Sequence, residues 1–187
     1  MIKSVAVYLG SSAASEEYMN IAYNFGRELA GRGYKAIFGG AEVGTMKAFA
    51  QGVIDARGDI LGVFPKGFKG KREVAALGRD ILMNTLTKTL EVKDMPERIA
   101  VMGSLSDCCV ILPGSFGTME ELFFLAVDNE IGIHDKRAFV LNVKGYYDGL
   151  ETQIATMKRE HFLRGDSDVI TFVHSVEELF DELGRSA

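Results

Sequence analysis

Residues 107–118 of the chain, DCCVILPGSFGT, decide the fold. The run Asp107–Leu112 is a short, continuous apolar segment, which is typical of a strand covered on both faces in a parallel sheet. A turn follows at 114–117, and the very apolar segment Thr118–Asn129 predicts a helix directly after it. A strand, a tight turn and a helix in this order form the first half of a strand–helix–strand crossover.

The same alternation extends along the rest of the chain. Further strands are expected at Ser4–Leu9, Ala36–Phe38, Ile60–Phe64, Ala138–Val143 and Val169–Phe172. Further helices are expected at Glu16–Arg32, Thr45–Ala56, Met95–Leu105, Tyr147–Arg159 and Val176–Leu183. The segment Asp80–Val92 is expected to be a strand or an extended arm. These elements predict a single Rossmann-like domain over residues 1–187: a doubly wound parallel α/β sheet with helices on both faces and a ligand crevice at the carboxyl ends of its strands.

The composition excludes several classes of protein. The formal net charge is −5, which argues against nucleic acid or an anionic membrane as the main partner. No apolar stretch approaches the roughly 20 residues of a membrane span. The only cysteines, Cys108 and Cys109, are adjacent, so no disulfide framework is expected and a cytoplasmic location fits. The three histidines share no ligand spacing, so no metal site is predicted.

Three of the expected strands end in loops of small residues: 10–12 (GSS), 39–45 (GGAEVGT) and 113–118 (PGSFGT). The carboxyl ends of parallel strands meet at one edge of the sheet, so these loops are expected to lie together. Small residues let a ligand approach the backbone, and the following helices direct free N–H groups toward it. The three loops predict a site for a phosphate or another anion. None has the spacing of a dinucleotide fingerprint or a P-loop.

Glu121 has two interpretations. With Thr118 as N-cap, a glutamate three residues later completes a capping box, and position alone favours this structural role. A carboxylate at the mouth of an anion site suggests a different task, such as binding sugar hydroxyls or stabilising a developing cation. Arg98, near the start of the helix Met95–Leu105, is a weak signal by itself, because a solvated arginine is common there.

The helix Thr118–Asn129 carries apolar residues on nearly every side, including Phe123, Phe124 and Leu125. This pattern predicts full burial, with another subunit as a candidate to cover it.

The segment 113–121, PGSFGTMEE, resembles the P-G-G-x-G-T-x-x-E signature of the Lonely Guy family. Its members are cytokinin riboside 5′-monophosphate phosphoribohydrolases, once described as lysine decarboxylases. Further segments are similar to family motifs in the same order: Val7–Ser12, Gly39–Met46, Met95–Arg98, Gly132–Lys136 and Asn142–Tyr147.

The resemblance implies a Rossmann-like fold, a homodimer or higher homo-oligomer, and a nucleotide substrate with no cofactor. The implied reaction is hydrolysis of the N-glycosidic bond of a nucleoside 5′-monophosphate, which yields a free base and ribose 5-phosphate. By the resemblance, Arg98 and Glu121 are the catalytic residues. The loops and the resemblance together assign substrate binding to Gly10, Ser11, Gly39, Gly40, Asp80, Gly114, Ser115, Phe116, Gly117, Thr118 and Glu120.

The chain departs from the family pattern at several positions. Pro96 and Ile99 stand where the family has His and Lys beside the arginine, and Ser115 replaces a glycine. Phe124 and Val127 replace polar residues on the glutamate helix, so the base preference stays open. A non-catalytic carrier remains the alternative, because molybdenum cofactor carrier proteins have a similar fold and loop. Lysine decarboxylation would need a Schiff-base lysine and pyridoxal phosphate, and no lysine is singled out for that role.

Overall fold

The computed structural model describes residues 2–41, 43–66, 87–163 and 169–185. Their strands form one seven-stranded sheet in the order β4-β3-β2-β1-β5-β6-β7, with every neighbouring pair parallel. The strands are β1 (Ser4–Tyr8), β2 (Lys35–Phe38), β3 (Ile60–Pro65), β4 (Thr87–Val92), β5 (Cys108–Ile111), β6 (Ala138–Leu141) and β7 (Ile170–Val173). The helices are α1 (Glu16–Gly31), α2 (Gly44–Asp55), α5 (Met95–Ser104), α6 (Phe116–Glu130), α7 (Asp148–Arg159) and α8 (Val176–Arg185), with a 3-10 turn at Val143–Gly145. The predicted doubly wound parallel sheet is confirmed.

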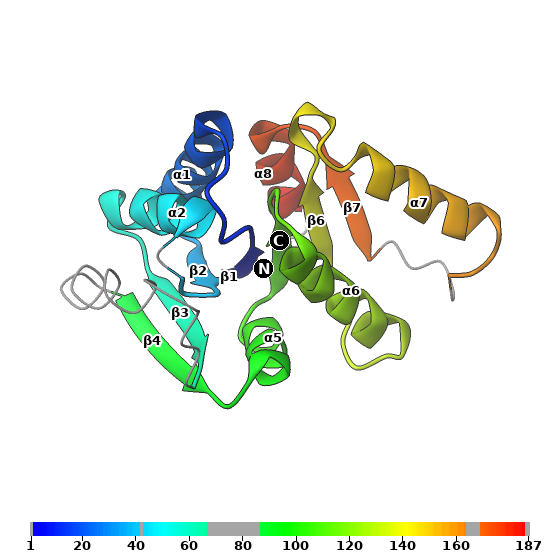
Figure 1. Ribbon diagram of the computed structural model, residues 1–187, viewed down its shortest axis with the longest axis horizontal. Coiled ribbons are helices and arrows are strands. Elements are labelled where there is room, and N and C mark those ends of the chain that lie inside the picture. The colour runs from blue at the N-terminus through cyan, green and yellow to red at the C-terminus, as the bar shows by residue number, and fades with distance from the viewer. Residues whose placement is uncertain (1, 42, 67–86, 164–168, 186–187) are drawn as a thin grey trace.

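Helices cover both faces of the sheet (Figure 1). Residues of α1, α2 and α8 pack on one face, and residues of α5, α6 and α7 pack on the other. The side chains of β1 alternate between the two: Val5 and Val7 join the first cluster, whereas Ala6 and Tyr8 join the second. This double burial is why the central strands are apolar at consecutive positions rather than at every second one.

The chain winds outward from β1 in two directions. Strands β2, β3 and β4 lie on one side of β1, and β5, β6 and β7 lie on the other. The carboxyl ends of β1 and β5 therefore form the point where the strand order reverses. Open α/β sheets bind ligands at such a point.

The outer side of α6 differs from the prediction. Leu122 and Leu125 are buried against the sheet, but Phe123 is 39% exposed and Val127 is 52% exposed. The expectation of full burial is wrong for the single chain, because Phe123 and Val127 line a groove between α6 and α7 that the side chains of α7 do not fill.

Cys108 and Cys109 are free and buried in β5, and burial raises the pKa of both thiols, that of Cys109 to about 12, so they are core residues. The strand expected within Asp80–Val92 is present from Thr87 onward, and residues 80–86 lie outside the described ranges. None of the described helices is long and apolar enough to cross a membrane.

Candidate active site

Backbone contacts join the three small-residue loops at one edge of the sheet. The Gly10 N–H donates to the Pro113 carbonyl (3.3 Å), which ties the first loop to the third. The Gly10 carbonyl accepts from the Thr45 hydroxyl (2.7 Å) and from the Met46 N–H (3.3 Å), which ties the first loop to the second. The loops therefore meet as predicted.

The helix α6 starts earlier than predicted, at Phe116, with Ser115 as its N-cap residue. Thr118 lies buried inside the first turn, and it packs so closely on Gly114 that a Cβ there would come within 2.1 Å of its hydroxyl oxygen. The predicted capping box is wrong, because Thr118 is not the N-cap and the Glu121 side chain binds another residue.

The start of α6 presents backbone donors. The first N–H bonded within the helix is that of Met119, which donates to the Ser115 carbonyl (3.1 Å). The N–H groups of Phe116, Gly117 and Thr118 bind no other described residue, as expected for the first turn of a helix. These donors and the positive end of the helix dipole favour an anion at this position.

Arg98 and Glu121 form a buried ion pair that joins α5 to α6. The Arg98 Nη2 donates to the Glu121 Oε1, and the two side chains are only 9% and 2% exposed. Gly39 of the second loop lies against the guanidinium, since a Cβ there would be 3.1 Å from Arg98 Nη1. Arg98 is therefore not a solvated arginine of the kind common at this position, because this part of α5 packs inward with Ile99 also buried.

Burial controls the charge of this pair. Burial raises the pKa of the Glu121 carboxyl from 4.5 to about 7, against the opposing effect of the Arg98 guanidinium. The Glu120 carboxylate adds a small further rise. A carboxyl group with a pKa near neutrality can hold or release a proton at physiological pH, which is the property required of a general acid or base.

Two buried polar atoms near the pair have no hydrogen-bond partner among the described residues. One is the Arg98 Nε and the other is the Tyr8 hydroxyl, at the carboxyl end of β1. Burial, and then the charges of nearby groups including Glu121, raise the pKa of Tyr8, so its hydroxyl stays protonated. Buried polar groups in proteins are nearly always bonded, and unpaired ones at the same place indicate a position for a ligand or water.

A cavity of about 250 Å³ lies between α5 and α6; Ile99, next to Arg98 in the chain, lines it, whereas Arg98 and Glu121 do not. Its wall includes Tyr8, Ile99 and Phe124, together with polar groups at Asp128 and His134. Two departures from the family pattern, Ile99 and Phe124, therefore lie in the same wall.

The other predicted site residues fall into two groups. One group is buried or half-buried where the loops meet: Gly10, Gly39, Gly40, Gly114 and Thr118. The other group is exposed: Ser11, Ser115, Phe116, Gly117 and Glu120. Asp80 lies outside the described residues. No group of three or more histidine, cysteine or acidic residues in the described ranges could hold a metal ion.

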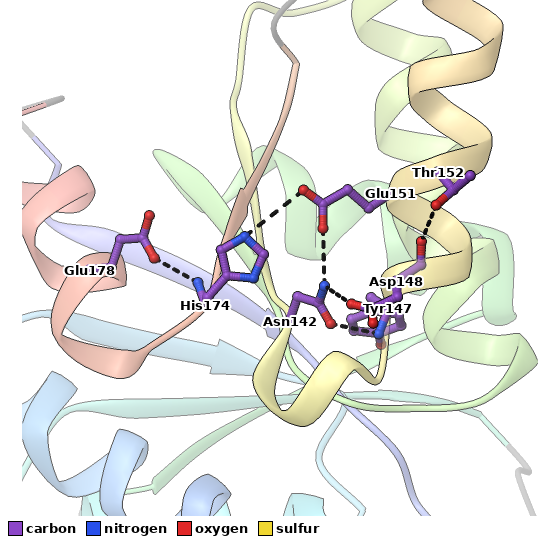
Figure 2. A network of polar contacts seen from close by, with 7 residues as sticks. All are labelled: Asn142, Tyr147, Asp148, Glu151, Thr152, His174 and Glu178. Carbon is purple, nitrogen blue, oxygen red and sulfur yellow. Dashed lines mark hydrogen bonds and ion pairs between the residues drawn. The ribbon is translucent and has the colours of Figure 1, made fainter.

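Sequence reasoning did not identify four residues that contact or support the loops: Tyr8, Asn142, Tyr146 and Tyr147. The hydroxyls of Tyr146 and Tyr147 donate to the carbonyls of Gly114 and Leu112. Asn142, at the end of β6, is buried at the centre of a polar network that holds Tyr147 (Figure 2). All four lie in the segments Val7–Ser12 and Asn142–Tyr147, whose similarity to family motifs was the signal that could have indicated this role.

The fold and these contacts define a class: a Rossmann-like α/β protein with free backbone donors at its switch point and an acid–guanidinium pair that joins α5 to α6. A family sequence profile described as "Possible lysine decarboxylase" matches residues 46–183. The chain is 36% identical to the cytokinin riboside 5′-monophosphate phosphoribohydrolase LOG5 of Arabidopsis thaliana, over 87% of this chain and 68% of that protein. It is 33% identical to LOG1 of the same plant, over 97% of this chain and 82% of that protein.

Solved structures agree on the architecture. A molybdenum cofactor binding protein from Rippkaea orientalis superposes with a TM-score of 0.70 at 20% identity, over 100% of this chain and 98% of that one. The molybdenum cofactor carrier protein of Chlamydomonas reinhardtii gives 0.64 at 15% identity, over 99% and 98%. At these identities the likeness concerns the fold alone. The sequence matches establish that the chain belongs to the Lonely Guy family.

Proposed function

We propose that this protein hydrolyses the N-glycosidic bond of a nucleoside 5′-monophosphate to a free base and ribose 5-phosphate. The observation that carries the proposal is the buried Arg98–Glu121 pair beside the free amides at the start of α6. Its relatives in Arabidopsis thaliana carry the name of this activity.

In the proposed complex, the 5′-phosphate binds the N–H groups of Phe116, Gly117 and Thr118. This anchor lies away from the reacting carbon, so its binding energy orients the sugar for reaction. The small residues of the first two loops would let the ribose approach the loop backbone: Gly10, Ser11, Gly39 and Gly40. Glu120, exposed near the start of α6, would contact the bound substrate. Asp80 is included on the resemblance alone.

Cleavage of the bond between C1′ and the base develops positive charge on the sugar, as in glycoside hydrolysis. Ionised Glu121 would stabilise that charge or accept a proton from the attacking water. Arg98 would hold the phosphate or assist the departing base, which leaves with the bonding electron pair. Release of Arg98 toward the substrate would also free the Glu121 carboxylate for this task.

The cavity between α5 and α6 would receive the base. Ile99 and Phe124 give its wall an apolar and aromatic surface, which favours a planar base carrying an apolar substituent over a polar one.

A second copy of the chain would cover the outer side of α6, which gives a homodimer. The exposed apolar residues there are Phe116, Phe123, Val127, Ile131 and Ile133. Several large apolar side chains exposed on one element and just beyond its end are typical of a protein interface. Light scattering should then give twice the 20.5 kDa mass of one chain. A cytoplasmic location remains the expectation set by the cysteines.

The carrier alternative predicts a different result. A carrier needs no carboxyl group with a pKa near 7 buried against an arginine, so the pair favours the hydrolase. Purified protein that retains a pterin and releases no base from any nucleotide would support the carrier instead.

The test is a panel of nucleoside monophosphates assayed for ribose 5-phosphate, followed by the variants Arg98→Ala and Glu121→Ala. Loss of an acid–base group costs about 100-fold or more in rate. Arg32→Ala is the matched control, because Arg32 forms an exposed pair with Glu28 on α1. Wild-type rates in both site variants would refute the assigned roles.

A further inference from the structure

Three consecutive carbonyl groups, at the end of β5 and the start of the third loop, are each held by a donor from another segment of the chain. The Leu112 carbonyl accepts from the Tyr147 hydroxyl (2.8 Å), and the Gly114 carbonyl accepts from the Tyr146 hydroxyl (2.7 Å). Between them, the Pro113 carbonyl accepts from the Gly10 N–H (3.3 Å). The loop therefore has no free carbonyl from residue 112 to residue 114.

The planarity of the peptide bond turns these contacts into an orientation for the amides. In a trans peptide, the carbonyl and the N–H of one unit point in opposite directions. A donor on the Gly114 carbonyl thus fixes the direction of the Ser115 N–H, and a donor on the Pro113 carbonyl fixes that of the Gly114 N–H. The Leu112 carbonyl shares its peptide with Pro113, which has no N–H, so the Tyr147 hydroxyl holds the start of the loop in place and orients no donor. Without these contacts, a glycine at position 114 would let the peptides rotate, because it has no Cβ.

Tyr147 is itself held from behind (Figure 2). Its N–H donates to the Asn142 Oδ1 (2.7 Å), and the Asn142 amide group donates to Asp148 Oδ1 (2.9 Å) and Glu151 Oε2 (3.0 Å). Asn142 and Tyr147 are 2% and 4% exposed, so this network is fixed by packing as well as by hydrogen bonds. Burial raises the pKa of the Tyr147 hydroxyl, which therefore remains a donor.

Tyr146 is more exposed, at 45%, but its ring is placed by two neighbours. It packs edge-on against Tyr147, with centroids 4.8 Å apart, and against Tyr18 of α1, at 5.6 Å. The rings of Tyr146 and Tyr147 therefore reach the loop from the segment that follows β6, where Tyr18, near the start of α1, packs against Tyr146.

We propose that Tyr146 and Tyr147 are positioning residues: Tyr146 sets the direction of the Gly114–Ser115 peptide group, and Tyr147 holds the chain at Leu112. Together they place the first turn of α6, and thereby set the affinity of its N–H groups for the phosphate of the substrate. The proposal rests on the proposed function for the identity of the ligand. Neither tyrosine touches the reacting atoms in it. Their hydroxyls act only through the backbone of the loop.

The test compares Tyr146→Phe and Tyr147→Phe with wild type by titration with ribose 5-phosphate, and with the free base as a second ligand. A neutral hydrogen bond contributes about 1 kcal/mol, or about fivefold. We expect the Kd of ribose 5-phosphate to rise about fivefold in each variant, KM for the nucleotide to rise by a similar factor, and kcat and the Kd of the base to stay within about twofold.

Tyr23→Phe is the matched control. It removes a tyrosine hydroxyl that donates to Asp55 (2.9 Å) between α1 and α2, away from the loop, and should leave every constant unchanged. Of the two variants, Tyr146→Phe is the one expected to fold like the wild type, because the side chain of Tyr146 is partly exposed and phenylalanine keeps the ring.

The outcomes separate this proposal from the proposed function. Wild-type protein that binds ribose 5-phosphate but hydrolyses no nucleotide overturns the function, and the titration still decides the role of the tyrosines. Unchanged affinity for ribose 5-phosphate in both folded variants overturns the positioning role. Wild-type protein that binds neither ribose 5-phosphate nor inorganic phosphate overturns both.

Discussion

Replacing Glu121 by glutamine should remove a specific pH dependence of stability. The Glu121 carboxyl has a pKa of about 7 in the folded protein, raised by burial from 4.5. Between these two values the folded chain holds a proton that the unfolded chain has released. The free energy of unfolding therefore falls as pH rises from about 4.5 to about 7, and this contribution is constant at higher pH.

The size of the effect follows from the two pKa values. Each unit of pKa difference corresponds to about 1.4 kcal/mol, and integration from pH 5 to pH 8 gives a loss of about 2.5 kcal/mol in the wild type. Glutamine does not titrate, so Glu121→Gln should lack this loss. The variant also loses the ion pair with Arg98, so the quantity to compare is the pH-dependent part of its stability and not the stability itself.

The assay is urea unfolding of both proteins at pH 5, 6, 7 and 8. Subtracting the two profiles cancels the titration of all other groups. Glu120→Gln is the matched control, because it removes the neighbouring carboxylate, which is exposed, and its profile should follow that of the wild type. Parallel profiles for wild type and Glu121→Gln would mean that burial does not raise the Glu121 pKa, and would refute the argument.

The remaining predictions concern activity, the loop and the surface. If ionised Glu121 is the active form, kcat/KM should rise with pH to a plateau with a midpoint near 7, and a midpoint near 4.5 would count against the role of burial. Gly114→Ala should lower the melting temperature and weaken ribose 5-phosphate binding at least tenfold, because the new Cβ would lie 2.1 Å from the Thr118 hydroxyl oxygen. Gly117→Ala should leave the melting temperature unchanged, because no atom lies within 4 Å of a Cβ at that position. Val127→Glu on the exposed side of α6 should convert a dimer to a monomer in light scattering, and an unchanged mass would place the interface elsewhere.

The sequence determined the architecture because the information is local and repeated. Consecutive apolar residues, as in Cys108–Leu112, require burial on both faces, and their alternation with helical periods leaves a parallel sheet as the solution. The small-residue loops at strand ends then placed the site at one edge of the sheet. The motif around Gly114 indicated the family, and the comparisons confirmed it.

Only the tertiary structure decided what the individual side chains do. Local position favoured a capping box for Glu121 and made Arg98 only a weak signal, yet the packing of α5 beside α6 buries both and joins them across 23 residues of sequence. The contacts of Tyr146 and Tyr147 with the loop likewise depend on β6 lying next to β5. A hydrogen bond between distant segments requires both to be placed to within a few tenths of an ångström, and that placement is set by the packing of the whole core rather than by any local pattern.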